Sequence, residues 1–308
     1  MDMDDSTLAE AFYDSALMRD KGDPELPNLF HDLGAIFWER YWKAKRASDL
    51  DRVISCYTES IQVTHYVDPQ LIRRRGMLVL ALTTRFRNDG DVTDLNKACS
   101  TYNRETILYV QNINAYACSA LIALAEALQA RFQQLGSVSD LESSLAAIQK
   151  AIASMPDTHP ELPKSLIFLG LSFKLRFERF GNISDLESAI AAQKELLKLV
   201  PDTHPAKLVA GTNLGQLLQQ RFERLGYDSD LEESLTTLRM VDDLTPDTDI
   251  YKSGRLVGLG CSLRARFVRF GDLSDLEEAI KFQKRAVELT SDTHPDRPVL
   301  LTNLGHSL

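Results

Sequence analysis

The sequence has little of what disulfide frameworks, metal sites or membrane spans require. Its four cysteines, in 308 residues, show no CxxC or other ligand spacing, so we expect small core residues at these positions. They are Cys56, Cys99, Cys118 and Cys261. No stretch is long and apolar enough to span a membrane, and residues 1–5 lack the basic and apolar blocks of a secretory signal. The expectation is a cytoplasmic protein without a membrane partner.

Positive charge and catalytic motifs are also scarce. Lysine and arginine number 35 against 44 acidic residues, and the net charge of -9 makes nucleic acid an unexpected partner. The sequence contains no G-x-S-x-G, P-loop or H-E-x-x-H motif. Cys56 and His65 are close along the chain, but nothing beside them supplies an oxyanion site. We therefore expect no enzyme activity in these residues, and no cofactor or metal.

A repeated marker is the main feature that the sequence does have. The segment that starts at Arg176 and runs Arg-Phe-Glu-Arg-Phe-Gly-Asn-Ile-Ser-Asp-Leu recurs with spacings of 45, 46, 45, 45 and 45 residues. Its copies begin at Arg40, Arg85, Arg131, Arg176, Arg221 and Arg266. A period of this size is typical of a helical repeat protein. In every copy we expect the arginine to pair with the aspartate that opens the following helix, such as Asp185.

Each unit is predicted to hold two helices, A and B. In the fourth unit helix A runs from about Lys164 to Phe180, and Gly181 ends it in the left-handed conformation. Gly90, Gly136, Gly226 and Gly271 take this place in other units, and Lys45 takes it in the first. Helix B opens with a predicted capping box, Ser184 to Glu187. All eleven prolines fall between a helix B and the next helix A, so no helix interior is broken.

The predicted fold is all-α: a right-handed α-solenoid of about six helix-turn-helix repeats with half repeats at both ends. We expect one domain over residues 1–308. Its predicted parts are a half repeat 1–23, repeats 24–68, 69–114, 115–159, 160–204, 205–249 and 250–294, and a truncated repeat 295–308. The cut inside a helix A suggests a fragment of a longer protein.

A family resemblance rests on small and large residues at fixed places. Leu169-Gly170, Phe173, Ala189 and Pro201 resemble the tetratricopeptide repeat (TPR) pattern, although the usual unit has 34 residues. With their 45-residue period and Pro-Asp-Thr-His-Pro linkers, the units resemble the TPR arrays of mushroom-forming fungi that often precede a caspase-like CHAT domain. The second unit departs most, because Val79 replaces the glycine. The resemblance implies a concave surface lined by helix A.

Carried over by position from each Leu-Gly pair, that surface gives all of the following candidate binding residues except Trp42, which is a candidate because it interrupts the repeat pattern. They are His31, Trp38, Trp42, Arg73, Glu126, Gln129, Lys164, Lys174, Thr212, Gln216, Gln219 and Arg264. The Lys and Asn clamp with which some TPR domains hold a carboxylate is not assembled, because Gly254 and Gly258 stand where Asn213 would need partners.

Trp38 and Trp42 break the pattern, because other units carry mostly polar residues at these two positions. Two interpretations stay open: an exposed anchor for a partner, or a pair covered by the N-terminal half repeat. Arg73-Arg74-Arg75 is similarly either a grip for an acidic peptide or a solvated helix edge.

The linker histidines His159, His204 and His294 are not expected to bind metal, since successive layers lie roughly 8–10 Å apart. Asp157 and Thr158 are expected to cap the next helix or tie the turn.

The predicted function is a scaffold that binds a protein or peptide on its concave helix A surface. Two alternatives are a sensor region of a CHAT-type protease whose catalysis lies outside this chain, and a module that self-associates through its C-terminal end.

Overall fold

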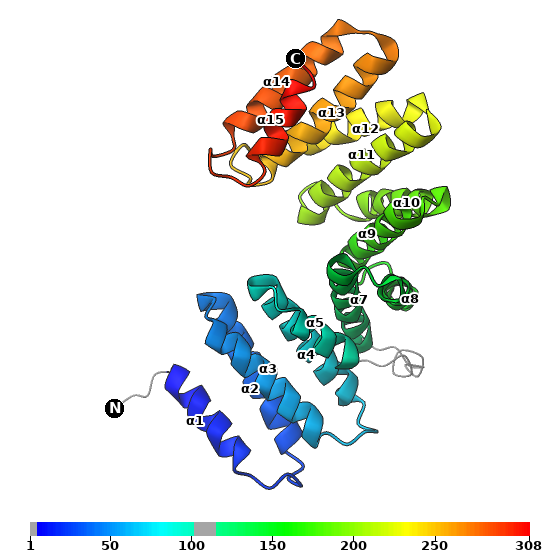
Figure 1. Cartoon of the computed structure of the whole chain (residues 1–308). Helices are drawn as coiled ribbons and strands as arrows, with labels where there is room; N and C mark the ends of the chain where they lie inside the picture. Colours follow the sequence, from blue (N-terminus) through cyan, green and yellow to red (C-terminus); the bar gives the residue numbers. More distant parts are fainter. Residues whose placement is uncertain (1–4, 102–114) are drawn as a thin grey trace. The chain divides into compact units, whose positions relative to one another are not determined.

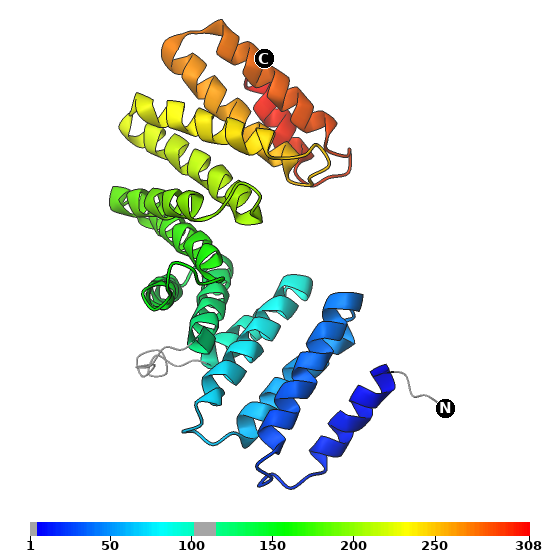
Figure 2. The same ribbon diagram turned by 180° about the vertical axis from the view of Figure 1, so that it is seen from behind.

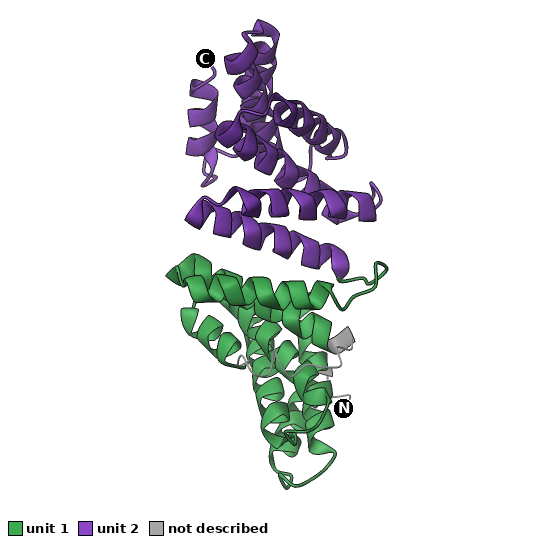
Figure 3. Cartoon of the chain, turned by 90° about the vertical axis from the view of Figure 1, so that its right-hand side faces the viewer, with its two compact units in different colours: residues 1–161 green, residues 162–308 purple. Residues whose placement is uncertain are grey.

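The computed structural model describes residues 5–101 and 115–308, without the side chains of residues 5–7, 115 and 116. Within this part of the chain all regular structure is helical and there is no strand. The chain divides into two compact units, residues 1–161 and 162–308, coloured separately in Figure 3. The expectation that both belong to one domain stays a prediction, and the predicted boundary at 114/115 borders the undescribed segment.

The first unit contains the helices α1 (Asp5–Leu17), α2 (Leu26–Ala44), α3 (Ala47–Val63), α4 (Gln70–Asp89), α5 (Val92–Thr101), α7 (Ala115–Leu135) and α8 (Val138–Ile152). The second unit contains α9 (Leu162–Phe180), α10 (Ile183–Leu199), α11 (Pro205–Leu225), α12 (Asp228–Asp243), α13 (Lys252–Phe270), α14 (Leu273–Glu288) and α15 (Arg297–Gly305).

Consecutive helices pack as hairpins, as Figures 1 and 2 show from opposite sides. The described residues form six A–B pairs: α2/α3, α4/α5, α7/α8, α9/α10, α11/α12 and α13/α14. Helix α1 packs on α2 and has the place of a helix B, while α15 packs on α14 and has the place of a helix A. The predicted all-α helical repeat with single helices at both ends is confirmed for the described residues. Within them, no helix is both long and apolar enough to cross a bilayer.

The turn between helix A and helix B has the same backbone geometry in every repeat. Gly90, Gly136, Gly181, Gly226 and Gly271 have φ angles of 77°, 70°, 73°, 73° and 81°. Each amide donates to the carbonyl four residues earlier at 2.7 Å, which closes the helix in the left-handed region where glycine carries no steric penalty. Lys45 adopts this conformation too, with φ 54°, so the first turn does not differ in geometry.

The predicted capping box is wrong. Helix α10 starts at Ile183 with Asn182 as its N-cap, and no side chain bonds there, so Ser184 already lies inside the helix. Helices α8, α12 and α14 likewise begin one residue before the corresponding serine. The buried aspartate in the first turn takes the polar role instead, because its carboxylate binds the marker arginine.

The glycine of each Leu-Gly pair lies where helix B comes closest to helix A. A Cβ atom on Gly34 would lie 2.9 Å from the Tyr57 ring, one on Gly215 2.6 Å from Leu238 Cγ, and one on Gly260 2.8 Å from Gln283 Cγ. Gln193 stands in the same way over Gly170. The small residue of the pattern is therefore required by the spacing of the two helices.

Gln193 gives a first prediction about stability. Its side chain is fully buried in the A–B interface, and neither amide atom has a hydrogen-bond partner among the described residues. A buried amide without partners costs free energy that an apolar side chain of similar size does not. Leu238 fills the equivalent place in the next unit. We expect Gln193→Leu to raise the free energy of unfolding by about 2 kcal/mol in urea titration. Leu238→Gln is the matched reverse change, and a Gln193→Leu protein that is less stable than the parent would contradict this account.

Candidate functional site

The repeated arginines are structural, as their recurrence indicates. Each marker arginine contacts the aspartate nine residues later. The distance is 2.8 Å in the first repeat, 2.7 Å in the second repeat and 2.6 Å in the other four repeats. In the fifth unit Arg221 Nε and Nη2 donate to both oxygens of Asp230 at 2.8 and 2.6 Å. The predicted pairing is confirmed, and it removes these six charges from the set of free ligand groups.

The linker histidines hold the turn before helix A, and His204 is also the N-cap of α11. Nδ1 of His204 accepts the amide hydrogen of Ala206 at 3.1 Å, and His159 and His294 do the same for the residues two places later. Asp249 accepts from the amide of Tyr251 at 2.7 Å at the equivalent place. The residue that precedes the linker proline or its replacement thus ties the turn, and not Asp157 or Thr158. No group of three potential metal ligands occurs among the described residues.

The arginine run 73–75 is divided between structural and surface roles. Arg74 is buried, and its guanidinium donates to Thr64 Oγ1 at 2.6 Å, Asp68 Oδ2 at 3.0 Å and Asn28 Oδ1 at 2.7 Å. Arg73 and Arg75 are half-buried. The run is therefore not a continuous basic patch, since its central residue holds the linker between α3 and α4.

The two tryptophans lie in an aromatic cluster on α2. The rings of Trp38 and Trp42 are 6.1 Å apart, and Lys45 Nζ lies 3.4 Å from the Trp42 ring centroid. Trp42 is 54% exposed, whereas Trp38 is half-buried against the core. The ring contacts of Tyr13 in α1 go to Phe30 and Phe37, so the half repeat does not cover Trp42. A polar residue at the position of Trp38 is not always in contact with solvent, because Thr83 in the second repeat is buried.

His31 lies beside Tyr57, with ring centroids 5.5 Å apart, and Arg73 is near both side chains. Burial, and then the charge of Arg73, lower the pKa of His31. The unfolded chain, with a pKa of about 6.5, then binds the proton more readily than the folded one. Stability contributed by neutral His31 is present above that value and is lost as the pH falls toward the folded pKa.

We expect the parent to lose more stability than His31→Phe between about pH 7 and pH 5, because phenylalanine does not titrate in this window. Urea unfolding at both pH values measures this difference, and equal losses would contradict the assignment.

Several candidate residues are not available to a partner or lie apart from the others. Glu126 and Gln129 are each 3% exposed, and Glu126 pairs with Arg87, so we leave both out of the proposed surface. Lys174 lies 3.7 Å from Glu178 on the same helix. Lys164, Gln219 and Arg264 are half-buried.

The structure brings Thr212 and Gln216 together in a pocket of about 460 Å³ between α11 and α13. We call it the α11–α13 groove. Its lining comprises Val209, Thr212, Asn213, Gln216, Ile250, Tyr251, Ser253, Gly254, Arg255, His294 and Asp296. Two of its apolar side chains are largely exposed to solvent: Ile250 is 81% exposed and Tyr251 is 66% exposed. The groove therefore joins apolar contact surface to polar groups, among which Arg255 and Asp296 are charged.

Ile250 and Tyr251 are not among the residues predicted from the sequence, although the repeat contains a signal for them. Ile250 stands where Pro24, Pro69, Pro160, Pro205 and Pro295 stand in other linkers. Gly254 also lies in the groove, and a Cβ atom at this position would meet nothing within 4 Å. The missing side chain leaves room in the groove.

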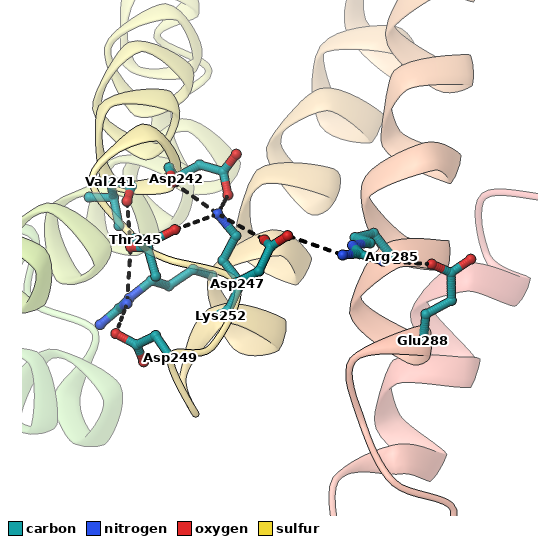
Figure 4. Close-up of polar contacts among 9 residues, drawn as sticks. Val241, Asp242, Thr245, Asp247, Asp249, Lys252, Arg285 and Glu288 are labelled. Atoms are coloured by element: carbon teal, nitrogen blue, oxygen red, sulfur yellow. Dashed lines mark hydrogen bonds and ion pairs between the residues drawn. The ribbon is translucent and has the colours of Figure 1, made fainter.

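A polar network holds the linker that carries these residues. Arg255 Nη1 donates to Thr245 Oγ1 at 3.0 Å and Asp249 Oδ2 at 2.9 Å. Lys252, labelled in Figure 4, belongs to the same network, and its Nζ donates to the carbonyl oxygens of Asp242 and Thr245, both at 2.9 Å. These cationic contacts satisfy carbonyls at the end of α12 and fix the start of α13.

The same network continues to the next helix pair. Asp247 binds Arg285 of α14 at 3.1 Å, and Arg285 also contacts Glu288 at 3.3 Å (Figure 4). The linker before α13 is thus held on two sides, and the groove has a fixed wall.

No protein-family model matches the sequence, and no curated protein matches it either. Solved structures do. BtubC (BKLC) from P. vanneervenii has 17% identity and a TM-score of 0.53, over 78% of this chain and 90% of that chain. The nuclear import adaptor Nro1 of S. pombe has 14% identity and a TM-score of 0.54, over 94% and 98% of the two chains. At such identities the likeness concerns the fold alone, which is an all-α helical repeat.

The thiols do not form reactive sites. Burial raises the pKa of Cys56 to about 12 and that of Cys99 to about 11. It also raises the pKa of Cys118 and Cys261. A protonated thiol is a poor nucleophile and a poor metal ligand, so these side chains serve packing.

Proposed function

We propose that this chain is a scaffold that binds an extended peptide segment of a partner protein in the α11–α13 groove. The observation that carries the proposal is the pairing of the exposed side chains of Ile250 and Tyr251 with the open space over Gly254. Apolar anchors flanked by a few polar groups are the usual chemistry of a peptide site.

The polar residues suit a peptide backbone. Thr212, Asn213 and Gln216 lie along α11 on one wall of the groove. Hydroxyl and amide groups of this kind both donate and accept hydrogen bonds, as a peptide main chain requires. The guanidinium of Arg255 is neutralised by Asp249, so the groove favours an uncharged apolar segment over an acidic one. Because the linker is already fixed, little ordering cost falls on the scaffold.

The test is selection of peptides from a random library displayed on phage, followed by affinity measurement with purified protein. Gly254→Leu fills the groove while keeping a good helix former in α13, and Ala191→Leu adds the same side chain to an exposed position of α10. We expect selected peptides to bind Gly254→Leu at least about tenfold more weakly and Ala191→Leu unchanged, a difference of about 1.4 kcal/mol. Equal binding to both variants would place the site elsewhere.

The aromatic cluster on α2 is a second candidate because Trp42 is more than half exposed. It belongs to the same class of function, and Trp42→Ala in the same assay separates the two surfaces. A caspase-like neighbour domain and a fungal source stay predictions of the resemblance. Sequencing the full transcript tests the first of these, and an open reading frame without a caspase-like segment would contradict it.

A further inference from the structure

Four departures of the first repeat from the other repeats lie together at the end of α2. Trp38 and Trp42 replace mostly polar residues, and Lys45 stands where the other turns have glycine. Tyr41 stands where the other markers have phenylalanine, at Phe86, Phe132, Phe177, Phe222 and Phe267. The structure brings the four side chains into contact with one another. Departures that meet at one point of the surface indicate a role that belongs to this repeat. We call the rings of Trp38, Tyr41 and Trp42 the aromatic platform.

The rings of the aromatic platform stand at steep angles to one another. The ring centroid of Trp42 lies 5.5 Å from that of Tyr41 and 6.1 Å from that of Trp38, with interplanar angles of 64° and 79°. Tyr41 is buried, and its hydroxyl accepts a hydrogen bond from Asn88 Nδ2 of α4 at 2.9 Å. Trp38 packs against the core. Two fixed rings therefore support Trp42, whose side chain is accessible from the solvent.

A cation already lies on the platform. Nζ of Lys45 is 3.4 Å from the ring centroid of Trp42 and 5.0 Å from that of Tyr41. This is the geometry of a cation–π interaction, in which the negative face of an aromatic ring attracts a positive charge.

The turn does not require the side chain of Lys45. Its amide donates to the carbonyl of Tyr41 at 2.7 Å, as the turn glycines do four residues after their own partners. Among the described residues, Lys45 is the only one other than glycine that has a positive φ, a conformation that carries a steric cost for a residue with a Cβ atom. The lysine thus indicates the chemistry that the platform attracts and is not needed for the fold.

We infer that the aromatic platform binds a methylated lysine of a partner protein, in the place that the ammonium group of Lys45 takes. The group seen on the rings is itself a lysine side chain, with an aliphatic stem and a positive end. The net charge of -9 attracts cationic segments of other proteins. The inference rests on the proposal that this chain binds a partner protein. It concerns the second candidate surface and not the α11–α13 groove.

Competition with Lys45 selects a methylated lysine over a plain one. Lys45 is tethered beside the rings, and a tethered group has an effective concentration on the order of millimolar. A ligand that displaces it must therefore bind the rings more strongly than an ordinary ammonium group. A trimethylammonium group keeps the charge but has no N–H groups to bind water, so its desolvation costs less. Quaternary ammonium is accordingly the class of cation that aromatic rings of proteins recognise.

The test uses the only two tryptophans of the chain, whose two indole N–H resonances report on the platform. The probe is N-acetyl-trimethyllysine amide, titrated into the full chain up to about 50 mM. Its matched control has a tert-butyl group in place of trimethylammonium, with the same shape and no charge. We expect the cation to bind about fivefold more tightly than the neutral analogue. Equal affinities, or no shift of either indole signal, would overturn the inference.

Two variants separate the ring from the internal cation. Lys45→Gly gives the first turn the residue of the other turns and removes the competing ammonium group, so the probe should bind about fivefold more tightly. An unchanged or weaker affinity would contradict the displacement of Lys45. Trp42→Leu keeps an apolar side chain at this exposed position and should bind the probe at least about fivefold more weakly, as read from the Trp38 signal. Circular dichroism verifies that both variants are folded.

The remaining controls identify the occupant. Peptides that bind the α11–α13 groove should bind Trp42→Leu as they bind the parent, so the two proposals can fail separately. Vesicles of phosphatidylcholine carry the same trimethylammonium group on a lipid. If they shift the indole signals of Trp38 and Trp42 and the trimethyllysine probe does not, the occupant is a lipid headgroup and the inference of a partner protein is overturned.

Discussion

Replacing Arg221 with methionine is expected to lower the free energy of unfolding by about 3–5 kcal/mol, among the largest effects of a single change in this chain. The carboxylate of Asp230 is almost completely buried, and Arg221 is the cation that binds both of its oxygens. Without the guanidinium, a buried charge keeps neither its partner nor access to water. The loss should exceed the value of the ion pair itself, because the stranded carboxylate adds its own desolvation cost.

Arg239→Met is the matched control. Arg239 also binds both oxygens of a carboxylate, Glu278, at 2.8 and 2.6 Å, but Arg239 is exposed and Glu278 is only half-buried. A bidentate pair in solvent contributes about 1 kcal/mol or less. Urea unfolding of the two variants compares two bidentate ion pairs whose carboxylates differ in burial. Equal losses would contradict the view that burial of the aspartate makes the marker arginine indispensable, and Arg221→Met/Asp230→Leu should recover much of the stability lost by the single variant.

The second large effect is expected at Gly215, where replacement with leucine should cost about 3 kcal/mol. A Cβ at this position would already lie 2.6 Å from Leu238 Cγ, and the remaining atoms of leucine would have to enter the core between α11 and α12. The helices must then separate or the side chains leave their rotamers. Gly254→Leu has the opposite sign, because its Cβ meets nothing and leucine is the better helix former by roughly 0.5–1 kcal/mol. Thermal unfolding followed by circular dichroism measures both, and a destabilised Gly254→Leu protein would contradict the open groove.

The repeat architecture could be predicted because its signals are local and recur. Gly181 and its equivalents are needed for a left-handed turn, and Arg176 pairs with an aspartate nine residues later. The spacing of these residues in the sequence is enough to predict the turn and the ion pair. The capping box failed for a physical reason. Ser184 and Glu187 have the right spacing, but the helix begins at Ile183, and the carboxylate of Asp185 is used by an arginine from the other helix. The local capping motif thus gave way to the contact between Arg176 and Asp185, which joins the two helices of the repeat.

The candidate surface was less accessible to prediction. Glu126 and Gln129 have polar side chains at positions that the resemblance assigns to a groove, yet both are buried, because burial depends on neighbours from other units. Ile250 could have been found by the rule that selected Trp42, since it also interrupts a repeated residue. The open space around Gly254 could not have been predicted from the sequence, because the space around a glycine depends on how adjacent helices pack.

The most direct test of the account is an NMR titration of the glycine amides with a peptide selected by the full chain. The 15 glycines include Gly254 and Gly258 on α13 at or beside the groove, and turn glycines such as Gly226 and Gly271 at the other end of the helices. The account predicts that the resonance of Gly254 shifts most, with a smaller shift at Gly258 and none at the turns. Shifts confined to the turn glycines, or no shift on a peptide that binds, would contradict a peptide site between α11 and α13.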